Sequence, residues 1–237
     1  RVVQVSILTA SGAACFFAAS CYPCECRFRI YQAELGAQVI AVCRQSSPGL
    51  EALRPYKTVS GIDVQHTGSV RHLKEEIGDE KIDVLINNAG LMVSEEESQS
   101  LQQIAQNLDA SILMFEKEYQ MNTLGPLRVT AVLLDQLSSG AKVVLLSSQM
   151  ASCVGNTNGR YYGYRSSKAG ANAMAVSMAH DLRERGLVVG VIHPGDIDTD
   201  VDIHPEASRA VFTRIQELKM EDSGSFVDAN SGKKLQF

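Results

Sequence analysis

The feature that most constrains the fold is a regular alternation of short β-branched segments with longer segments of helical pattern. The predicted strands are nearly all apolar, as strands buried on both faces should be; they are Val2–Leu8, Gln38–Val42, Thr58–Gly61, Val84–Asn87, Lys142–Ser147, Val188–His193 and Ser225–Val227. The predicted helices lie between them, and several end at a glycine or before a proline: Glu51–Leu53, Ser69–Ile77, Gln120–Leu137, Tyr164–Arg185 and Ala207–Leu218. This order indicates an α/β fold with a central, mostly parallel seven-stranded sheet covered by helices on both faces.

Length and charge narrow the class of protein. The chain has 237 residues, of which 45% are apolar; this is enough for one well-buried core, so we expect a single doubly wound, Rossmann-type domain over residues 1–237. The formal net charge is -5 and no run of Lys or Arg occurs, which argues against nucleic acid or an anionic membrane surface as a partner. No apolar run reaches the ~18 to 20 residues that cross a bilayer. A small molecule is the expected ligand.

The cysteines indicate a reducing compartment. Four of the six are crowded between residues 15 and 26, unlike the spread framework of a secreted disulfide protein, so we expect reduced thiols and a cytoplasmic location. Cys21, Cys24 and Cys26 lack a fourth ligand nearby and would make a poor tetrahedral zinc site. The sequence therefore predicts no metal site.

Tyr164 and Lys168 form the most informative motif. They are four residues apart in Tyr-Arg-Ser-Ser-Lys, so on a helix both side chains project from one face. A free tyrosine has a pKa of ~10, and a cation within ~4 to 6 Å typically lowers such a value by ~1 to 3 units. Alone, the pair also fits a solvated helix face. Tyr161 and Tyr162 lack a lysine four residues on, so Tyr164 is the predicted general acid or base.

Three further motifs each follow a predicted strand. Asn87-Asn88-Ala89-Gly90 follows the fourth strand, Ser147-Ser148 ends the fifth, and Pro194-Gly195 follows the sixth. Each is also an ordinary turn signal. Because open α/β sheets bind ligands at the carboxyl ends of their strands, the ordered set indicates one site at that edge. The serines lack a Gly-x-Ser-x-Gly elbow, which favours hydrogen-bond donors over nucleophiles.

Together these motifs resemble the short-chain dehydrogenase/reductase family, from about Gly36 to the C-terminus. The tail from Asp222 to Phe237 is similar to that of the C-factor and sniffer-type carbonyl reductase branch. The resemblance implies an NADP(H)-dependent oxidoreductase that transfers a hydride between nicotinamide and a small carbonyl or secondary alcohol. It also implies a homodimer or homotetramer formed through the helices that contain Asn122 and Tyr164.

The resemblance also implies a role for each matched residue. Tyr164 exchanges a proton with the substrate oxygen, and Lys168 binds the nicotinamide ribose and lowers the tyrosine pKa. Ser148 polarises the carbonyl, and Asn122 anchors a proton-relay water. Ser148 lies farther from Tyr164 than the family spacing and Ser152 closer, so the Gly155-Asn156-Thr157-Asn158-Gly159 loop is predicted to carry an insertion, with Ser148 favoured.

The cofactor assignment rests on Arg44. It follows the second strand, where a guanidinium can pair with a ribose 2′-phosphate, and no Asp or Glu ends that strand, so NADP(H) is favoured over NAD(H). A solvated arginine is the alternative. Asp63 matches the family's adenine contact. The other predicted cofactor-binding positions lie in strand-end loops: Gly12, Asn88, Ala89, Gly90, Pro194, Gly195, Ile197 and Thr199.

Residues 12–35 depart from the family pattern. Counting from Gly12, the second and third glycines of the nucleotide-binding loop are replaced by Phe16 and Ala18, and a phenyl ring there should obstruct the pyrophosphate. An unusual insertion and a segment outside the functional reading frame both explain this. The alternative function is therefore a degenerate member of the fold, weakly catalytic or inactive, that acts through protein contacts or signalling.

Overall fold

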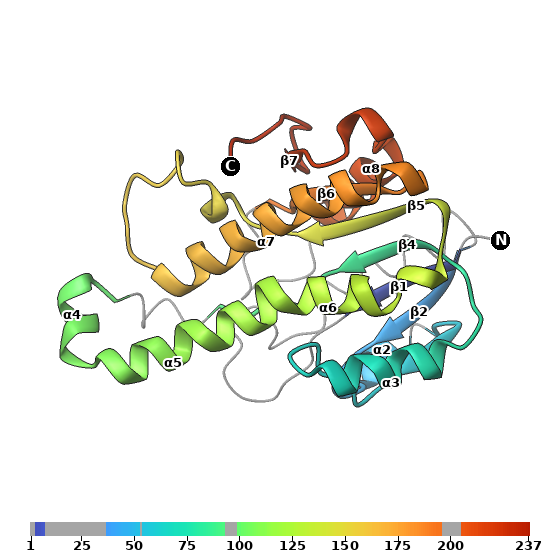
Figure 1. Cartoon of the computed structure of the whole chain (residues 1–237), viewed down its shortest axis with the longest axis horizontal. Helices are drawn as coiled ribbons and strands as arrows, with labels where there is room; N and C mark the ends of the chain where they lie inside the picture. The colour runs from blue at the N-terminus through green and yellow to red at the C-terminus, as the bar shows by residue number, and fades with distance from the viewer. Residues whose placement is uncertain (1–2, 8–36, 53, 93–98, 196–204) are drawn as a thin grey trace.

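A parallel sheet forms the centre of the molecule (Figure 1). The computed structural model describes residues 3–7, 37–52, 54–92, 99–195 and 205–237. Within these ranges seven strands pair in parallel in the order β3-β2-β1-β4-β5-β6-β7. The strands are β1 Val3–Ile7, β2 Gln38–Val42, β3 Lys57–Val59, β4 Ile82–Asn87, β5 Leu137–Leu146, β6 Val188–His193 and β7 Phe226–Asp228. The predicted doubly wound α/β architecture is confirmed.

Helices connect successive strands, because parallel strands need a crossover between them. Among the described residues they are α2 Pro48–Ala52, α3 Thr67–Ile77, α4 Leu101–Gln106, α5 Leu108–Tyr119, α6 Gly125–Val132, α7 Tyr162–Asp181 and α8 Pro205–Glu217. Short turns of other helix types join them: the π-helical η2 Gln120–Leu124 and the 3₁₀ turns η3 Leu134–Gln136, η4 Gln149–Ala151, η5 Arg183–Arg185 and η6 Met220–Asp222. None of the helices described is both long and apolar enough to cross a bilayer.

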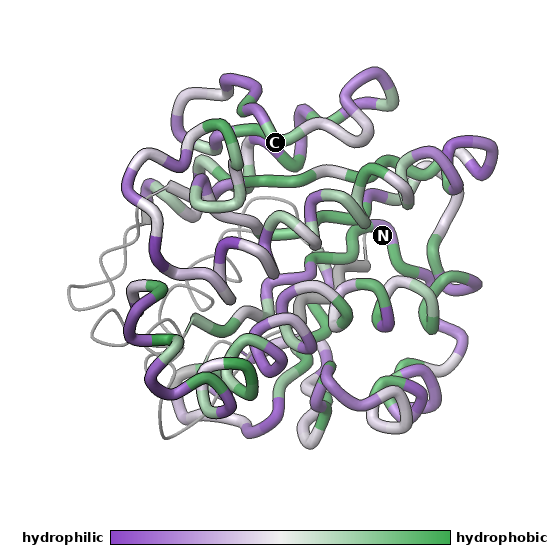
Figure 2. The backbone as a smooth tube through the Cα atoms, turned by 60° about the vertical axis from the view of Figure 1, so that its left-hand side comes forward, coloured by the Kyte–Doolittle hydropathy of each residue, from purple (hydrophilic) through white to green (hydrophobic). Residues whose placement is uncertain are grey.

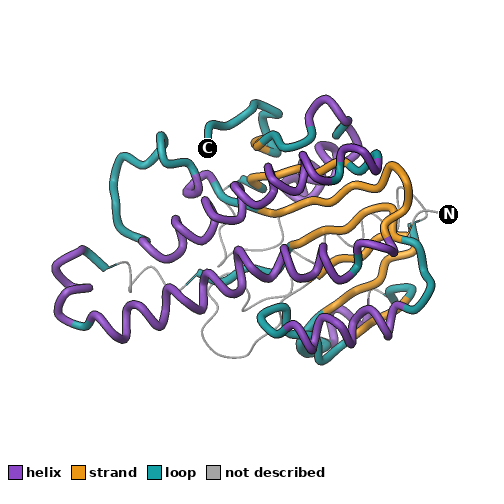
Figure 3. Tube along the Cα trace, viewed as in Figure 1, coloured by secondary structure: helices purple, strands orange, loops and turns teal. Residues whose placement is uncertain are grey.

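The sheet buries both of its faces. Along β2, Ile40 and Val42 join a core with α3, α6 and α7, while Val39 and Ala41 join a second core with α2 and α8. This alternation is the two-residue period of a strand, and it explains why β2 reads as a continuous apolar run. Figure 3 shows α6 and α7 lying over the strands, and Figure 2 shows hydrophobic segments in the interior with hydrophilic turns at the rim.

Two helices, α4 and α5, were not predicted from the sequence. α4 begins with a capping box, in which the Ser100 hydroxyl accepts from the Gln103 amide and the Gln103 side chain accepts from the Ser100 amide. This Ser-x-x-Gln signal was present in the sequence. α5 extends past the carboxyl ends of the strands, beside the first turns of α7 (Figure 1).

The prediction of one helix over Gln120–Leu137 is wrong. The segment contains the π turn η2, the helix α6 and the 3₁₀ turn η3, and β5 begins at Leu137. Leu137 pairs with Ile82, but the next pair is Lys142 with Val84, so the register shifts and β5 contains a bulge between these two pairs. Gly140 adopts a φ of 78° within the bulge. Regular pairing with β4 resumes at Lys142, the residue at which the sequence predicts the strand to begin.

Candidate active site

The predicted site residues that the structure describes gather at one edge of the sheet. Because all the strand pairings are parallel, the carboxyl ends of β4, β5 and β6 face the same way. Asn88 follows β4, Ser148 follows β5 and Pro194 follows β6, while Tyr164 lies in the first turn of α7. Four segments far apart in the chain therefore meet at this edge.

Ser148 is the serine that contacts the tyrosine. Its side chain is hydrogen-bonded to the Tyr164 phenol, and its Oγ also accepts from the Met150 amide at 3.2 Å at the start of η4. The Ser152 Oγ instead accepts from the Gly155 amide at 3.1 Å, within the following loop. The hydrogen-bond geometry thus places Ser148, and not Ser152, beside the phenol.

The pKa of the Tyr164 phenol is higher than its spacing from Lys168 predicts. Burial raises its pKa to about 12; the hydrogen bond from Ser148 acts in the opposite direction, and the nearby charge of Glu118 raises the pKa further. The prediction of a lowered pKa in the protein is wrong because burial outweighs the neighbouring groups. Lys168 does lie close, with its Nζ 5.9 Å from the centre of the Tyr164 ring.

Lys168 is buried, with 6% of its surface exposed. Its Nζ donates a hydrogen bond of 2.8 Å to the Leu146 carbonyl at the end of β5. Burial lowers the pKa of this amine to about 8. A Cβ on Gly90 would lie 3.4 Å from the Nζ. The glycine after β4 therefore leaves the space next to the amine open.

Asn122 lies in the π turn η2, and its side chain forms hydrogen bonds to two other segments, at Leu91 and at Ser167. Its Oδ1 accepts from the Leu91 amide at 2.7 Å, and its Nδ2 donates to the Leu91 carbonyl at 2.7 Å and to the Ser167 Oγ at 2.9 Å. Ser167 in turn donates to the Tyr164 carbonyl at 2.8 Å. Single π turns are frequent at functional sites. Ser167 was not predicted, although its spacing of one helical turn from Tyr164 was a usable signal.

Arg44 fits a negatively charged group at the carboxyl end of β2. Its backbone carbonyl accepts from the Gly61 amide at 3.0 Å, which fixes the turn. Its Nε is buried and has no hydrogen-bond partner among the described residues, although buried donors are normally paired. An anionic group could accept from this guanidinium. Asp63 lies after the neighbouring β3, and its Oδ1 accepts from the Gln65 amide at 2.9 Å.

The remaining cofactor positions are placed in part. Gly195 follows β6 with a φ of 94°, and a Cβ on it would overlap the Asn230 side chain, so this turn requires a glycine. Ala89 is buried between Asn88 and Gly90. The predicted positions Gly12, Ile197 and Thr199 lie outside the described residues, as does the whole of 12–35.

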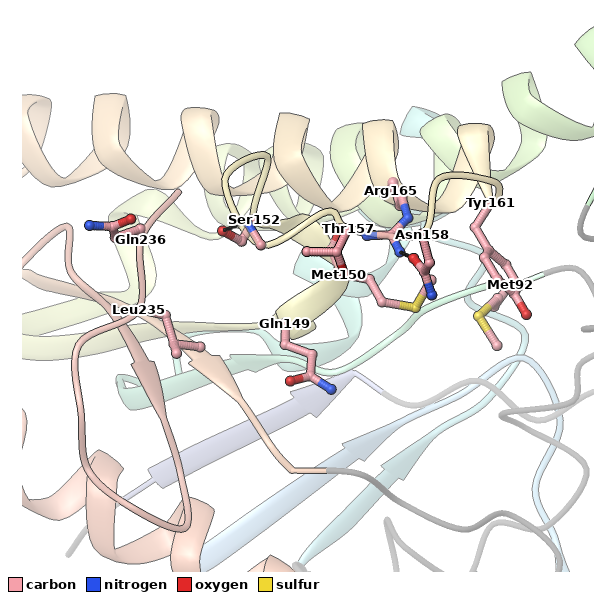
Figure 4. Close-up of a pocket in the computed structure, with 11 residues that line it drawn as sticks. Met92, Gln149, Met150, Ser152, Thr157, Asn158, Tyr161, Arg165, Leu235 and Gln236 are labelled. Atoms are coloured by element: carbon pink, nitrogen blue, oxygen red, sulfur yellow. Dashed lines mark hydrogen bonds between the residues drawn. The ribbon is translucent and has the colours of Figure 1, made fainter. Parts of the chain in front are cut away.

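A cavity of about 530 Å³ is lined by Gln149 and Arg165, the residues that follow Ser148 and Tyr164 in the chain, although Ser148 and Tyr164 are not themselves part of its lining (Figure 4). Its wall combines residues that follow Ser148, residues that flank Tyr164 and residues near the end of the chain. They are Met92, Gln149, Met150, Ser152, Gly155, Thr157, Asn158, Tyr161, Arg165, Leu235 and Gln236. Arg165 joins two sides of the cavity, since its Nη2 donates to the Asn158 Oδ1 at 2.7 Å and its Nη1 to the Met150 carbonyl at 3.3 Å. The mixed lining suits a small molecule with polar and apolar parts.

Comparison with known proteins decides the family. Residues 30–209 match the family model for short chain dehydrogenases. The chain belongs to the short-chain dehydrogenase/reductase family. It is 32% identical over 203 residues to 1-hydroxy-2-glutathionyl-2-methyl-3-butene dehydrogenase of Rhodococcus sp. (strain AD45), covering 81% of this chain and 85% of that protein. It is 37% identical over 155 residues to C-signal of Myxococcus xanthus, covering 62% of this chain and 88% of C-signal.

Solved structures of this family share the fold. Carbonyl reductase Sniffer of D. melanogaster superimposes with a TM-score of 0.74 at 21% identity, covering 100% of this chain and 99% of the other. A carbonyl reductase from Pseudomonas aeruginosa PAO1 in complex with NADP has a TM-score of 0.73 at 24% identity, with both chains covered fully at 100%. The predicted resemblance to the C-factor and sniffer-type branch is confirmed.

Proposed function

We propose that this protein is an NADP(H)-dependent carbonyl reductase, built as one domain, in which Tyr164 is the general acid and base. The observation that carries the proposal is the hydrogen bond between Ser148 and the Tyr164 phenol beside the cavity. Lys168, one helical turn from the phenol, adds a buried amine at the same edge. Proton donor, polarising hydroxyl and amine thus form one cluster next to a space for a substrate.

The chemistry of reduction follows from this cluster. Ser148 donates a hydrogen bond to the substrate carbonyl oxygen, which makes the carbonyl carbon more electrophilic. NADPH, when bound, supplies the hydride to that carbon. Tyr164 gives its proton to the oxygen, so the product alcohol gains one C–H and one O–H bond, and the phenolate regains a proton from solvent. Asn122 and Ser167 hold the backbone that positions the phenol.

NADP(H) is the proposed cofactor because of Arg44. The Nε of this residue, which has no partner among the residues that the structure describes, is a donor at the position where a 2′-phosphate would extend from the ribose. Lys168 would bind the nicotinamide ribose, and Gly90, without a side chain, leaves space beside that amine. The NADP complex of the Pseudomonas aeruginosa carbonyl reductase supports this choice.

The alternative of a degenerate, inactive protein finds no support in the comparisons. It rests on residues 12–35, which lie outside the described part of the chain. The four predicted catalytic residues, by contrast, are all present in the described part of the chain, and each has at least one hydrogen-bond partner there. We therefore favour catalysis over a role through protein contacts alone.

We further propose self-association through α5 and α7. Leu108, Ile112 and Tyr119 are exposed by 53%, 44% and 39% along α5, and their spacing places them on one side of the helix. Tyr162 at the start of α7 is exposed by 43%. Light scattering should give a dimer or tetramer; a monomer at all concentrations would contradict this.

The direct test of function is NADPH consumption. The purified protein would be mixed with NADPH and a panel of aromatic aldehydes, aliphatic ketones and cyclic ketones, and absorbance at the nicotinamide band followed. We expect turnover with at least one carbonyl and formation of the matching alcohol. Saturable NADPH binding without turnover of any carbonyl would overturn the carbonyl reductase proposal.

A further inference from the structure

A buried acid lies next to the tyrosine centre. Glu118 is on α5 and only 3% of its surface is exposed, whereas Glu116 and Lys117 on the same turn are exposed. Charged side chains are seldom buried so completely unless the surroundings hold them for a reason. No motif in the sequence distinguished Glu118 from the other acids of this segment.

The place of Glu118 is fixed by a glycine. A Cβ built on Gly163 would overlap the Glu118 Oε2 and the Cδ1 of Phe115, and would lie 3.0 Å from the Phe115 Cα. The Glu118 carboxylate therefore lies directly against the backbone of the residue that precedes Tyr164. Gly163 is required at this position by steric fit, since any side chain would displace the acid or move α7 away from α5.

The first turn of α7 favours a negative charge at this point. α7 begins at Tyr162, and among the described residues its N-cap, Tyr161, makes no side-chain cap hydrogen bond. The amide groups of a first helical turn carry a partial positive charge, which stabilises a nearby carboxylate. The start of α7 therefore supplies a favourable electrostatic environment for the Glu118 carboxylate.

We propose that Glu118 is a positioning residue for Tyr164, which fixes the first turn of α7 through Gly163 and opposes formation of the phenolate through its charge. This inference rests on the proposed function and deepens it. In the structure the burial of the phenol raises the tyrosine pKa, the Ser148 hydrogen bond lowers it, and the negative charge of Glu118 raises it further. Glu118 thus adds to burial in favouring the acid form of the phenol that carbonyl reduction needs.

The groups that face the phenol come from three elements. Lys168 lies on α7 itself, Ser148 at the start of η4, and Glu118 on α5. Arg165, the neighbour of Tyr164, is directed to Asn158 and the Met150 carbonyl. Because burial lowers the pKa of Lys168 to about 8, this amine is neutral where the phenol titrates. Glu118 is then the charged group that disfavours the phenolate, so removing its charge should lower the pKa of Tyr164.

The test compares Glu118→Gln with Glu116→Gln, a matched control on an exposed position of the same helix. Alcohol oxidation at saturating NADP⁺ needs the phenolate, so its rate rises with pH through the pKa of Tyr164 in that complex. We expect the midpoint of this rise to fall by about one pH unit in Glu118→Gln, to stay unchanged in Glu116→Gln, and to return toward the wild-type value in Glu118→Asp. An unchanged midpoint in Glu118→Gln would overturn the proposal, as would a loss of rate with no change of midpoint.

A second readout does not depend on activity. The tyrosinate absorbance of Tyr164 is isolated by a difference of two alkaline titrations, wild type minus Tyr164→Phe. The same difference without Glu118 is Glu118→Gln minus Glu118→Gln/Tyr164→Phe. The Tyr164 signal should appear at lower pH without Glu118. If no carbonyl is reduced but this shift occurs, the proposed function fails and the electrostatic role of Glu118 stands. Coincident difference titrations would overturn the role of Glu118 even if the protein is an active reductase.

Discussion

The two ends of the candidate site are held in different ways. At the carboxyl end of β5, Lys168 and Asn122 each have protein hydrogen-bond partners and Tyr164 is hydrogen-bonded to Ser148. At the carboxyl end of β2, the buried Nε of Arg44 has no partner among the described residues. In the described part of the chain, the groups proposed to carry out chemistry are paired within the fold, whereas the arginine proposed to bind the cofactor phosphate has one donor without a partner.

The largest effect should follow from removing the phenolic hydroxyl. Tyr164→Phe deletes the proton donor but keeps the ring, so kcat for carbonyl reduction should fall by about 10² to 10⁴-fold. NADPH binding should stay close to the wild-type value, because the change lies at the chemical end of the site. Steady-state kinetics and a binding titration measure both. A variant with full reductase activity would refute the assignment of Tyr164.

Ser148→Ala should have the next largest effect. Loss of one hydrogen-bond donor to the carbonyl oxygen typically costs about 10²-fold in kcat. Ser152→Ala is the control, since Ser152 lines the cavity but bonds within its own loop. Similar losses of kcat in Ser148→Ala and Ser152→Ala would contradict the assignment of Ser148 as the serine that binds the carbonyl oxygen.

Arg44→Gln tests the other end of the comparison. Removing one charge-assisted contact to a phosphate should weaken NADPH binding about tenfold and leave NADH binding unchanged, with kcat at saturating NADPH preserved. The measurement is a titration of both cofactors into both proteins. Equal weakening for NADPH and NADH would mean that Arg44 acts through the fold and not through the 2′-phosphate.

The smallest effect is a change in how stability depends on pH. The pKa of Lys168 is about 8 in the folded protein against an ordinary value of 10.5, so between these values the unfolded chain binds more protons. The free energy of unfolding should therefore rise from pH 8 to pH 10 by at most about 1.4 kcal/mol per pH unit, and this gain is lost as the pH falls back to 8. Lys168→Met should remove this slope. Urea denaturation at pH 8 and pH 10 measures it, and identical slopes in the two proteins would contradict the burial of a titrating amine.

The sheet and the tyrosine motif were the parts of the molecule that the sequence predicts best. The bounds Gln38–Val42 and Val188–His193 agree with the structure residue for residue, because strands covered on both faces are continuous apolar runs. Tyr164 and Lys168 share a helix face because four residues span about one turn. α4 and α5 were missed because most of their side chains are exposed, including several apolar ones, so they do not follow the pattern of a helix with a buried apolar face. The capping box at Ser100 was the available signal.

Features that depend on distant segments were not predictable in this way. Leu235 reaches the cavity wall only because β7 and the chain end pack beside β6. The sequence does not distinguish Glu118 from the other acids of α5, because the close approach of Glu118 to Gly163 depends on the packing of α7 against α5. The sign of the Tyr164 pKa shift also depends on burial, which spacing to Lys168 does not reveal.

The most direct test of the central claim is a titration of the wild-type protein and Tyr164→Phe with NADPH, followed by nicotinamide fluorescence and then by a single turnover with a reducible carbonyl. We expect saturable binding of equal affinity in both proteins and rapid reduction only in the wild type. Absence of saturable binding at millimolar NADPH, or equal single-turnover rates in the two proteins, would contradict it.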